Sequence, residues 1–217
     1  MVLMPRGSGY RYGEVLLVTV TFAVFALVAA DSSGVRVIEA VLAGAILELA
    51  VLTSNAPRRT RRAAGLALGI AVVAGGIAAA VGDTRPVWTF GATALLLAAT
   101  AAVISAGVGR LVIERGVNLQ AVLGALSIYV LLGLTFGFIV GTIASATDKP
   151  YFAQGTDATQ AARVYYSFTV MTTTGFGDYT AAARGGRALA VLEMLIGQLY
   201  LVTVIAILVG NLRRPRE

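Results

Sequence analysis

Runs of about 20 apolar residues recur along the chain, and they limit its possible folds more than any other feature of the sequence. A helix rises about 1.5 Å per residue, so a run of this length crosses the roughly 30 Å hydrocarbon core of a bilayer. Hydrophobic residues make up 58% of the chain and charged residues 13%, a balance that a water-soluble domain does not need. The sequence therefore predicts an all-α membrane protein with six transmembrane helices, at about residues 14–30, 35–54, 64–82, 87–107, 120–145 and 186–211.

The connections between these runs differ in charge. One set carries eleven of the 17 basic residues, and the alternate set carries six basic residues and all five Asp residues. The first set comprises Arg6, Arg11, Arg58, Arg59, Arg61, Arg62, Arg110, Arg115, Arg213, Arg214 and Arg216, and the second Arg36, Arg85, Lys149, Arg163, Arg184 and Arg187. Because cytoplasmic connections carry an excess of Lys and Arg, we expect a multi-pass protein of the plasma membrane with both termini in the cytoplasm. An even number of spans agrees, since it places both termini on one side.

The first run has an alternative interpretation. Arg6 and Arg11, followed by an apolar stretch that ends in small residues at 28–30, are also typical of a cleavable signal peptide. We favour the transmembrane interpretation.

Some residue types are absent, and their absence limits the chemistry of the chain. The sequence has no Cys and no His, which excludes disulfides, thiolate chemistry and proton transfer by histidine. It has no nucleophile–base constellation and no phosphate-binding glycine loop, so we expect neither an enzyme nor a cofactor. The net charge of +6 comes from short clusters between apolar runs, which indicates membrane topology and not nucleic-acid binding. Sixteen of the 17 basic residues are Arg, a composition typical of a bacterial protein from a GC-rich genome.

The connection between the fifth and sixth runs, residues 148–183, differs from the others. It is too polar for a seventh span and too long for an ordinary tight connection. Irregular backbone is tolerated at membrane depth only inside protein or beside a water-filled space. We therefore expect a re-entrant segment here, with the functional site inside it.

That connection contains the sequence Ser167-Phe168-Thr169-Val170-Met171-Thr172-Thr173-Thr174-Gly175-Phe176-Gly177-Asp178-Tyr179. A K⁺ ion that sheds its water needs a cage of oxygen atoms, which backbone carbonyl groups of four chains can supply around an axis. Adjacent carbonyls can point the same way only if some residues take left-handed backbone angles, which Gly adopts at little cost. A Thr at the inner end can add its hydroxyl oxygen to the lowest site.

Residues 172–178 resemble the T-V-G-Y-G-D signature of the potassium-channel family, with Thr174 where Val or Ile is usual and Phe176 where Tyr is usual. The resemblance is specific over about residues 120–211. It implies a homotetramer in the lipid bilayer that passes monovalent cations, because one chain supplies one filter segment and four close the ring. It also implies that the selectivity filter is Thr173, Thr174, Gly175, Phe176 and Gly177, with K⁺ bound at the first four of them.

The resemblance also assigns the surroundings of the filter. Residues 161–171 would form a pore helix whose C-terminal end, with its partial negative charge, favours a cation. Thr172 and Asp178 would flank the filter, and Tyr165 and Tyr166 would surround it. We expect the Tyr165 hydroxyl to bond Asp178, with simple aromatic packing as the alternative.

The last run is similar to the inner helix of potassium channels. Gly197 stands where that family has a bending point, although a glycine here also lets neighbouring helices approach closely. Thr203 and Ile207 would line the cavity or its lower gate. Glu193 is a costly carboxylate inside the membrane, and we expect it behind the filter, bonded to the pore helix.

The fifth run contains Gly133, Gly137 and Gly141 at four-residue spacing. A stripe of small residues lets two helices pack closely. We expect the inner helix to rest on this stripe.

The first four runs stand where six-span channels have a voltage-sensing domain. A gating charge contributes about 2.3 kcal/mol per 100 mV when it crosses the membrane field, yet residues 87–109 contain no charge. We therefore expect residues 1–107 to form a four-helix peripheral domain without an Arg-rich voltage sensor. Glu48 is a possible sensor, for example of protons. Arg36 and Glu39 are expected to pair on one helix face.

The remaining residues complete the predicted organisation. Residues 108–119 would form an interfacial linker helix, and residues 120–217 the pore domain of outer helix, pore helix, filter and inner helix. The predicted function is passive, K⁺-selective conduction. Thr174 leaves open a non-selective channel for Na⁺ and K⁺, and a non-conducting membrane sensor that retains the pore fold is a further alternative.

Overall fold

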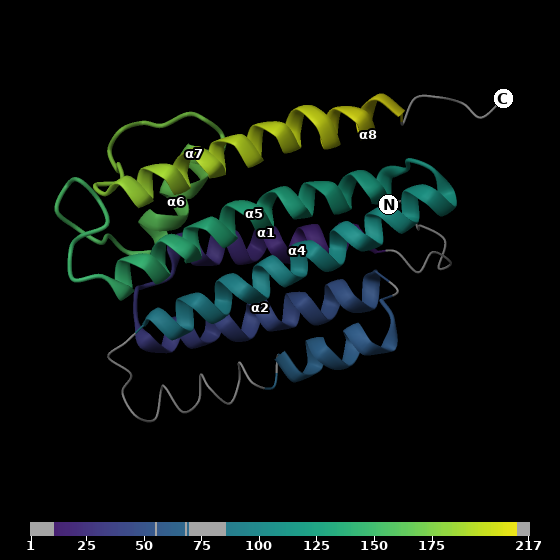
Figure 1. Ribbon diagram of the computed structural model, residues 1–217. Coiled ribbons are helices and arrows are strands. Elements are labelled where there is room, and N and C mark those ends of the chain that lie inside the picture. Colours follow the sequence, from purple (N-terminus) through teal and green to yellow (C-terminus); the bar gives the residue numbers. More distant parts are fainter. Residues whose placement is uncertain (1–10, 55, 68, 70–85, 212–217) are drawn as a thin grey trace.

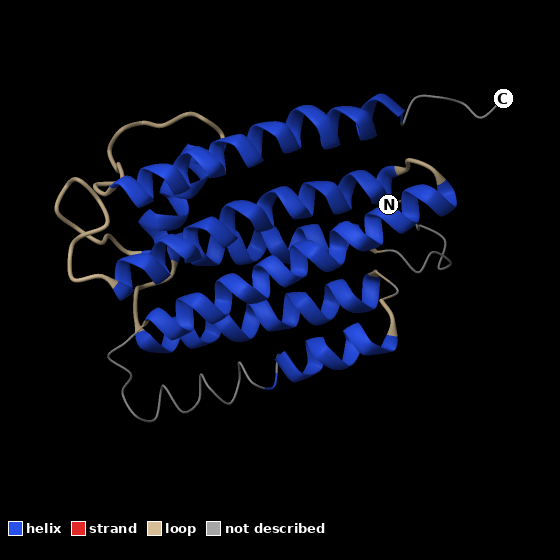
Figure 2. Ribbon diagram, viewed as in Figure 1, coloured by secondary structure: helices blue, strands red, loops and turns tan. Residues whose placement is uncertain are grey.

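The computed structural model describes residues 11–54, 56–67, 69 and 86–211, and all regular structure within them is helical (Figures 1 and 2). The first helices are α1 (Tyr12–Val28) and α2 (Ser33–Thr53), and residues 58–67 are also helical. Then follow α4 (Val87–Arg115), α5 (Leu119–Ala146), the short α6 (Gln160–Met171) and α7 (Arg184–Leu199). A π-helical turn, η1 (Tyr200–Ile205), joins α7 to α8 (Ala206–Asn211). The predicted all-α fold is confirmed.

Three helical stretches in the described part of the chain are long and apolar enough to cross a membrane: Val87–Arg115, Leu119–Ala146 and Arg184–Asn211. The helix Tyr12–Val28 is apolar but shorter. α2 coincides with the predicted second run, yet it is not one of the three. Most of the predicted third run, residues 64–82, lies outside the described residues.

The predicted linker helix at residues 108–119 does not exist as a separate element. Residues 108–115 continue α4, which ends where Gly116 takes a φ of 70°. Asn118 then caps the next helix, its side chain accepting a hydrogen bond from the Ala121 amide at 3.1 Å. The charges at Arg110, Glu114 and Arg115 suggested an interfacial helix, but helical geometry is interrupted only at residues 116–118.

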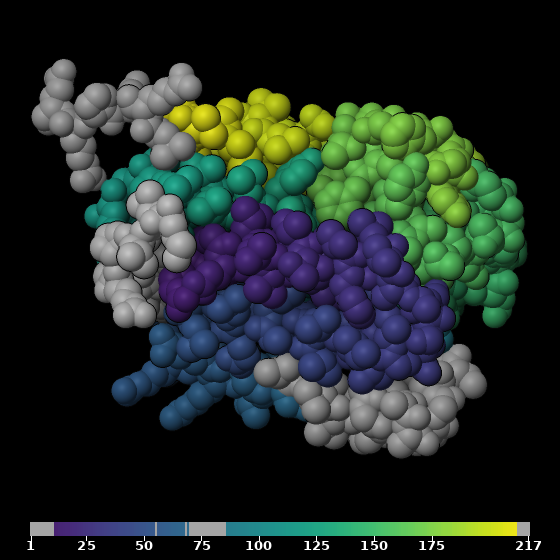
Figure 3. All heavy atoms as spheres, turned by 180° about the vertical axis from the view of Figure 1, so that it is seen from behind, coloured from purple at the N-terminus to yellow at the C-terminus, as the bar shows by residue number. Residues whose placement is uncertain are grey.

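α5 is the central helix of the molecule (Figure 1). It packs against α1, α4 and α6, and α2 packs against α1 and α4. The contact with α1 and α4 is aromatic: the Phe138 ring lies 6.2 Å from the rings of both Phe22 and Phe90. Seen from behind, α1 covers the side of the bundle between α2 and α5 (Figure 3).

α6 and its two flanking loops lie at one end of the bundle, and α7, η1 and α8 run along one edge of it (Figure 1). The start of α1 and the end of α8 lie at the end opposite to α6 (Figure 1). The edge helix is poorly covered by the rest of the chain. In the most apolar 18-residue stretch of residues 184–211, 17% of the residues are buried, whereas the corresponding share in α5 is 67%.

Candidate functional site

The two loops around α6 are joined to each other. Ala153 donates its amide hydrogen to Thr180 O at 2.8 Å, and Ala182 donates to Tyr151 O at 2.9 Å. The loop before α6 thus holds the chain that follows the predicted filter. Phe152, 1% exposed, anchors this arrangement because its ring packs 5.1 Å from the Tyr166 ring of α6.

Every second residue of the predicted filter has a positive φ angle, in the left-handed region of the backbone. Thr173, Gly175 and Gly177 take φ values of 58°, 50° and 83°. Two of these residues are glycines, which adopt left-handed angles easily. Thr173 is β-branched and rarely adopts them, at a cost of about 1–3 kcal/mol for such a residue. Local backbone strain of this kind concentrates at functional sites.

The amides at the start of this segment turn back to α6. Thr173 N bonds Val170 O at 2.8 Å, and the amides of Thr174 and Gly175 bond Thr169 O at 2.9 and 3.1 Å. Among the described residues, no group donates a hydrogen bond to a carbonyl oxygen of residues 173–177. These oxygens are therefore available to a ligand.

Side chains at the base of the segment also interact. The hydroxyl oxygens of Thr172 and Thr174 lie 2.9 Å apart. The Thr173 hydroxyl donates to Thr172 O at 2.7 Å, and the Gln198 amide of α7 donates to the Thr173 hydroxyl at 3.4 Å. The sequence analysis did not identify Gln198, because only the fold brings it to the filter.

The two tyrosines of α6 have different surroundings. The Tyr165 ring stacks on the Phe176 ring, with centroids 6.2 Å apart and an interplanar angle of 4°. The pKa of Tyr165 is raised by desolvation and then by its interaction with the Asp178 carboxylate. Tyr166 is instead buried against Phe152. Tyr166 nevertheless lines a pocket together with Thr173, Gly175 and Gly177.

Glu193 lies behind α6. Its side chain is 1% exposed and is hydrogen-bonded to the Ser167 hydroxyl of α6. Ser167 in turn bonds Gly133 O of α5 at 2.6 Å. The structure thus brings Glu193 into contact with the predicted pore helix.

Gly197 is required for close packing. A Cβ atom there would lie 2.6 Å from Met171 O and 2.5 Å from Met171 Cγ, at the C-terminal end of α6. The sequence allowed either a hinge or a packing role; these distances favour the packing role, and the hinge role stays a prediction. The π-helical turn η1 begins three residues later, and such turns are frequent at functional sites. Nothing in the sequence analysis indicated it.

The predicted gate residues lie on this edge helix. Thr203 is in η1, where its hydroxyl bonds Leu199 O one turn earlier. Ile207 is in α8 and is 61% exposed. Neither is packed inside the single chain, and their gate role stays a prediction.

The expectation for the glycine stripe of α5 was wrong. A Cβ atom on Gly137 would lie 3.0 Å from Val164 Cα, and one on Gly133 would lie 2.7 Å from the Phe168 ring. A Cβ atom on Gly141 would meet Gln160 at 2.8 Å. All three neighbours belong to α6. The stripe supports the predicted pore helix and not the inner helix, because the short α6 lies between them.

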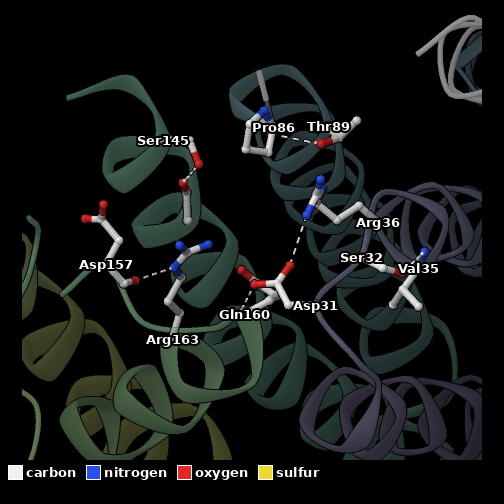
Figure 4. Close-up of polar contacts among 11 residues, drawn as sticks. Asp31, Ser32, Val35, Arg36, Pro86, Thr89, Ser145, Asp157, Gln160 and Arg163 are labelled. Carbon is white, nitrogen blue, oxygen red and sulfur yellow. Dashed lines mark hydrogen bonds and ion pairs between the residues drawn. The ribbon is translucent and has the colours of Figure 1, made fainter. Parts of the chain in front are cut away.

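Charged residues meet at the end of the bundle that holds α6, where the sequence predicted only an Arg36–Glu39 pair (Figure 4). Arg36 instead bonds the Asp31 carboxylate at 3.0 Å, and Asp31 also accepts a hydrogen bond from the backbone amide of Gln160 at 3.2 Å. Glu39 is 2% exposed, and its Oε2 atom has no partner in the described part of the chain. The α1–α2 connection therefore binds the first residue of α6.

Arg163 of α6 joins the same region. Its Nε atom donates to Asp157 O at 2.8 Å, and its guanidinium lies 5.1 Å from the centre of the Phe90 ring (Figure 4). The Arg36 guanidinium lies 5.8 Å from that ring. α2, α4 and α6 thus share one cluster.

Glu48, the possible sensor, does not meet an arginine in the described residues. Its Oε1 atom is buried without a hydrogen-bond partner there. A Cβ atom on Gly65 would lie 3.3 Å from it, which places Glu48 against the helical residues 58–67. Its sensor role stays a prediction.

Comparison with known proteins covers the C-terminal part of the chain. A family model described as an ion channel matches residues 126–214. No curated protein and no solved structure matches the chain significantly. An ion-channel domain and apolar helices of spanning length together support a membrane protein that passes ions. Over residues 126–214, the chain is therefore similar to an ion-channel domain.

Proposed function

We propose that the chain is one subunit of a homotetrameric, K⁺-selective channel of the plasma membrane, with residues 173–177 as its selectivity filter. The observation that carries the proposal is the backbone of this segment. Left-handed residues alternate at 173, 175 and 177, and its carbonyl oxygens accept no hydrogen bond from the described residues. Rings of such carbonyls replace the water of a dehydrated K⁺ ion.

The dimensions of α6 support a re-entrant segment. Its 12 residues extend about 18 Å, which is too short to cross the roughly 30 Å hydrocarbon core. Both loops beside α6 lie at the same end of the bundle (Figure 1). The chain would enter the membrane as α6 and return along the filter to that side. The end of α6 that precedes the filter carries the partial negative charge of the helix dipole, which favours a cation.

Exposed apolar side chains support the assembly. α7 and η1 present large apolar residues that are 40–68% exposed in the single chain: Val191, Leu192, Leu195, Ile196, Leu199 and Val202. Phe176 of the filter segment is 69% exposed. One filter segment supplies only one wall of a cage, so four chains around an axis would complete it and cover this face.

The helix directions support the proposed sidedness. The start of α1 and the end of α8 lie at the end opposite to α6 (Figure 1), as expected for six spans with cytoplasmic termini. The excess of basic residues in the connections at that end is typical of the cytoplasmic side. The filter mouth would then face outward.

Ion flux into liposomes that contain the purified protein tests the proposal. With K⁺ as the only permeant cation we expect flux that Ba²⁺ blocks, and with Na⁺ little flux. Absence of K⁺ flux from a folded tetramer would contradict the proposal and favour the non-conducting sensor.

The chain offers a matched pair of variants. Gly175 and Gly155 both have positive φ values, 50° and 75°, and both have open space where a Cβ atom would stand. Alanine at either position should therefore cost a similar amount, about 1–2 kcal/mol. We expect Gly175→Ala to abolish K⁺ flux and Gly155→Ala to retain it. Equal flux from the two variants would mean that residues 173–177 are not the filter.

A non-selective cation channel is the second candidate because of Thr174. Its hydroxyl lies 2.9 Å from the Thr172 hydroxyl and adds a polar group where the family usually has an apolar one. Because the Thr172 hydroxyl already engages it, we expect Thr174→Val to leave the ratio of K⁺ to Na⁺ flux unchanged. A ratio that rises in this variant would show that the hydroxyl admits Na⁺.

A further inference from the structure

Three helices meet at one hydroxyl group behind the predicted filter. Ser167 of α6 is fully buried, and its oxygen contacts Gly133 O of α5 at 2.6 Å and the Glu193 carboxyl group of α7. Ser167 lies six residues before Thr173, where the filter begins. The arrangement of protons at this point therefore determines how the helices around the filter are joined.

The Ser167 hydroxyl has one proton, whereas a backbone carbonyl can only accept. If Glu193 were ionised, both neighbours of the Ser167 oxygen would be acceptors, and one of the two short contacts would contain no proton. If Glu193 is a neutral acid, it donates to Ser167, and Ser167 donates to Gly133 O. Only the neutral acid gives every short oxygen–oxygen contact its own proton.

The surroundings of Glu193 agree with a neutral acid. A buried carboxylate is costly unless a cation or several hydrogen bonds compensate it. In the described part of the chain, the ionisable groups that face Glu193 are the Tyr151 hydroxyl of the loop before α6 and the Tyr166 hydroxyl of α6, and neither is a cation. Arg187, on the same helix, directs its Nε atom to Ala181 O instead. The second carboxyl oxygen of Glu193 has no hydrogen-bond partner among the described residues.

We infer that Glu193 is a protonated carboxylic acid in the folded channel and that it starts a proton-donor chain from Glu193 through Ser167 to Gly133 O. This chain holds the inner, pore and outer helices together behind the filter. Glu193 is thus a positioning residue, since it acts through Ser167 and touches no ion. The bonds are intact while Glu193 keeps its proton and are lost as the pH rises and the acid ionises.

Infrared spectroscopy of the purified protein tests the protonation state without any need for conduction. A protonated carboxylic acid has a C=O stretching band that is separate from the bands of a carboxylate. We expect the spectrum of the wild type minus that of Glu193→Gln, at neutral pH, to show the acid band. The buried Glu39 contributes equally to both spectra and cancels. A difference spectrum with carboxylate bands instead would overturn the inference.

Two further variants sharpen this test. Glu14 is ion-paired to Arg11 with its side chain 47% exposed, so Glu14→Gln should remove carboxylate bands only. Ser167→Ala removes the acceptor of the Glu193 proton and should move the acid band to higher frequency. An acid band that does not move in Ser167→Ala would exclude the donor chain even if Glu193 is neutral.

The effect on conduction rests on the proposed function and has its own readout. The amide of Glu193→Gln can donate to Ser167 as the acid does, so this variant should conduct at neutral pH. Wild-type flux should fall as the pH rises, and flux through Glu193→Gln should not. Identical pH profiles of the wild type and Glu193→Gln would contradict this pH-dependent role of Glu193. Absence of flux from both proteins, with the acid band present, would refute the proposed function and leave the protonation state established.

Discussion

Replacement of Gly197 by Ala tests whether this residue serves close packing or bending. A Cβ atom there would stand 2.6 Å from Met171 O, about 0.8 Å short of the 3.4 Å at which ordinary contact begins. The obstacle is backbone, which cannot turn aside as the end of a side chain can. α7 would have to move away from the end of α6, and overpacking of this kind costs about 1–3 kcal/mol.

A second glycine separates this cost from the effect of alanine on the helix itself. Gly109 lies inside α4 with nothing within 4 Å of its Cβ position. Alanine in place of either glycine should favour the helix by up to about 1 kcal/mol. The free energy of unfolding of Gly197→Ala should therefore lie about 1–3 kcal/mol below that of Gly109→Ala.

Unfolding of both variants in detergent, monitored by circular dichroism, measures this difference in the free energy of unfolding. The packing argument predicts that Gly197→Ala loses stability and that the pore segment loses its flux with it. Equal stability of the two variants, with altered flux only in Gly197→Ala, would refute the packing argument and make the residue a hinge.

Three further predictions follow from the surroundings of α6. Asp31→Asn removes the negative charge at the N-terminus of α6 and should lower the free energy of unfolding by about 0.3–1 kcal/mol. The control Asp148→Asn, in an exposed loop, should leave the free energy of unfolding unchanged. Equal unfolding free energies of the two variants would contradict the role of Asp31. Gly137→Ala should be less stable than Gly109→Ala, because its Cβ atom would lie 3.0 Å from the α6 backbone; equal stability would mean that α6 can shift freely. Tyr165→Phe keeps the ring on Phe176 but loses the hydroxyl near Asp178, so sustained K⁺ flux should decline faster than in the wild type, and an unchanged time course would show that only the ring matters.

The sequence predicted the helices better than their partners. The apolar runs located α1, α2, α5 and α7 to α8 within a few residues, and they located the start of α4, because hydrophobic length alone determines which segments can cross a membrane. The short α6 was also predicted, from its place before the glycine-rich segment. The end of α4 was missed, since charged residues from 110 to 115 look like an interfacial helix until the backbone shows no break before Gly116.

Contacts between distant residues were the part that the sequence could not provide. The glycine stripe of α5 indicated that some helix approaches closely, but its spacing cannot name that helix. Glu193 was expected next to the pore helix because its buried carboxyl group needs a partner. That expectation did not reveal Ser167 or Gly133 as the partners, since a hydroxyl and a carbonyl have no distinctive pattern.

The contacts beside the N-terminus of α6 connect α2 and α4 to the segment that leads into the predicted filter. Asp31, in the α1–α2 connection, binds Arg36 of α2 and the Gln160 amide of α6. Arg163 of α6 and Arg36 both lie against Phe90 of α4. A shift of α2 or α4 at this end must therefore displace the N-terminus of α6 or break these contacts. Because α6 leads directly into residues 173–177, we expect such a displacement to alter the predicted filter.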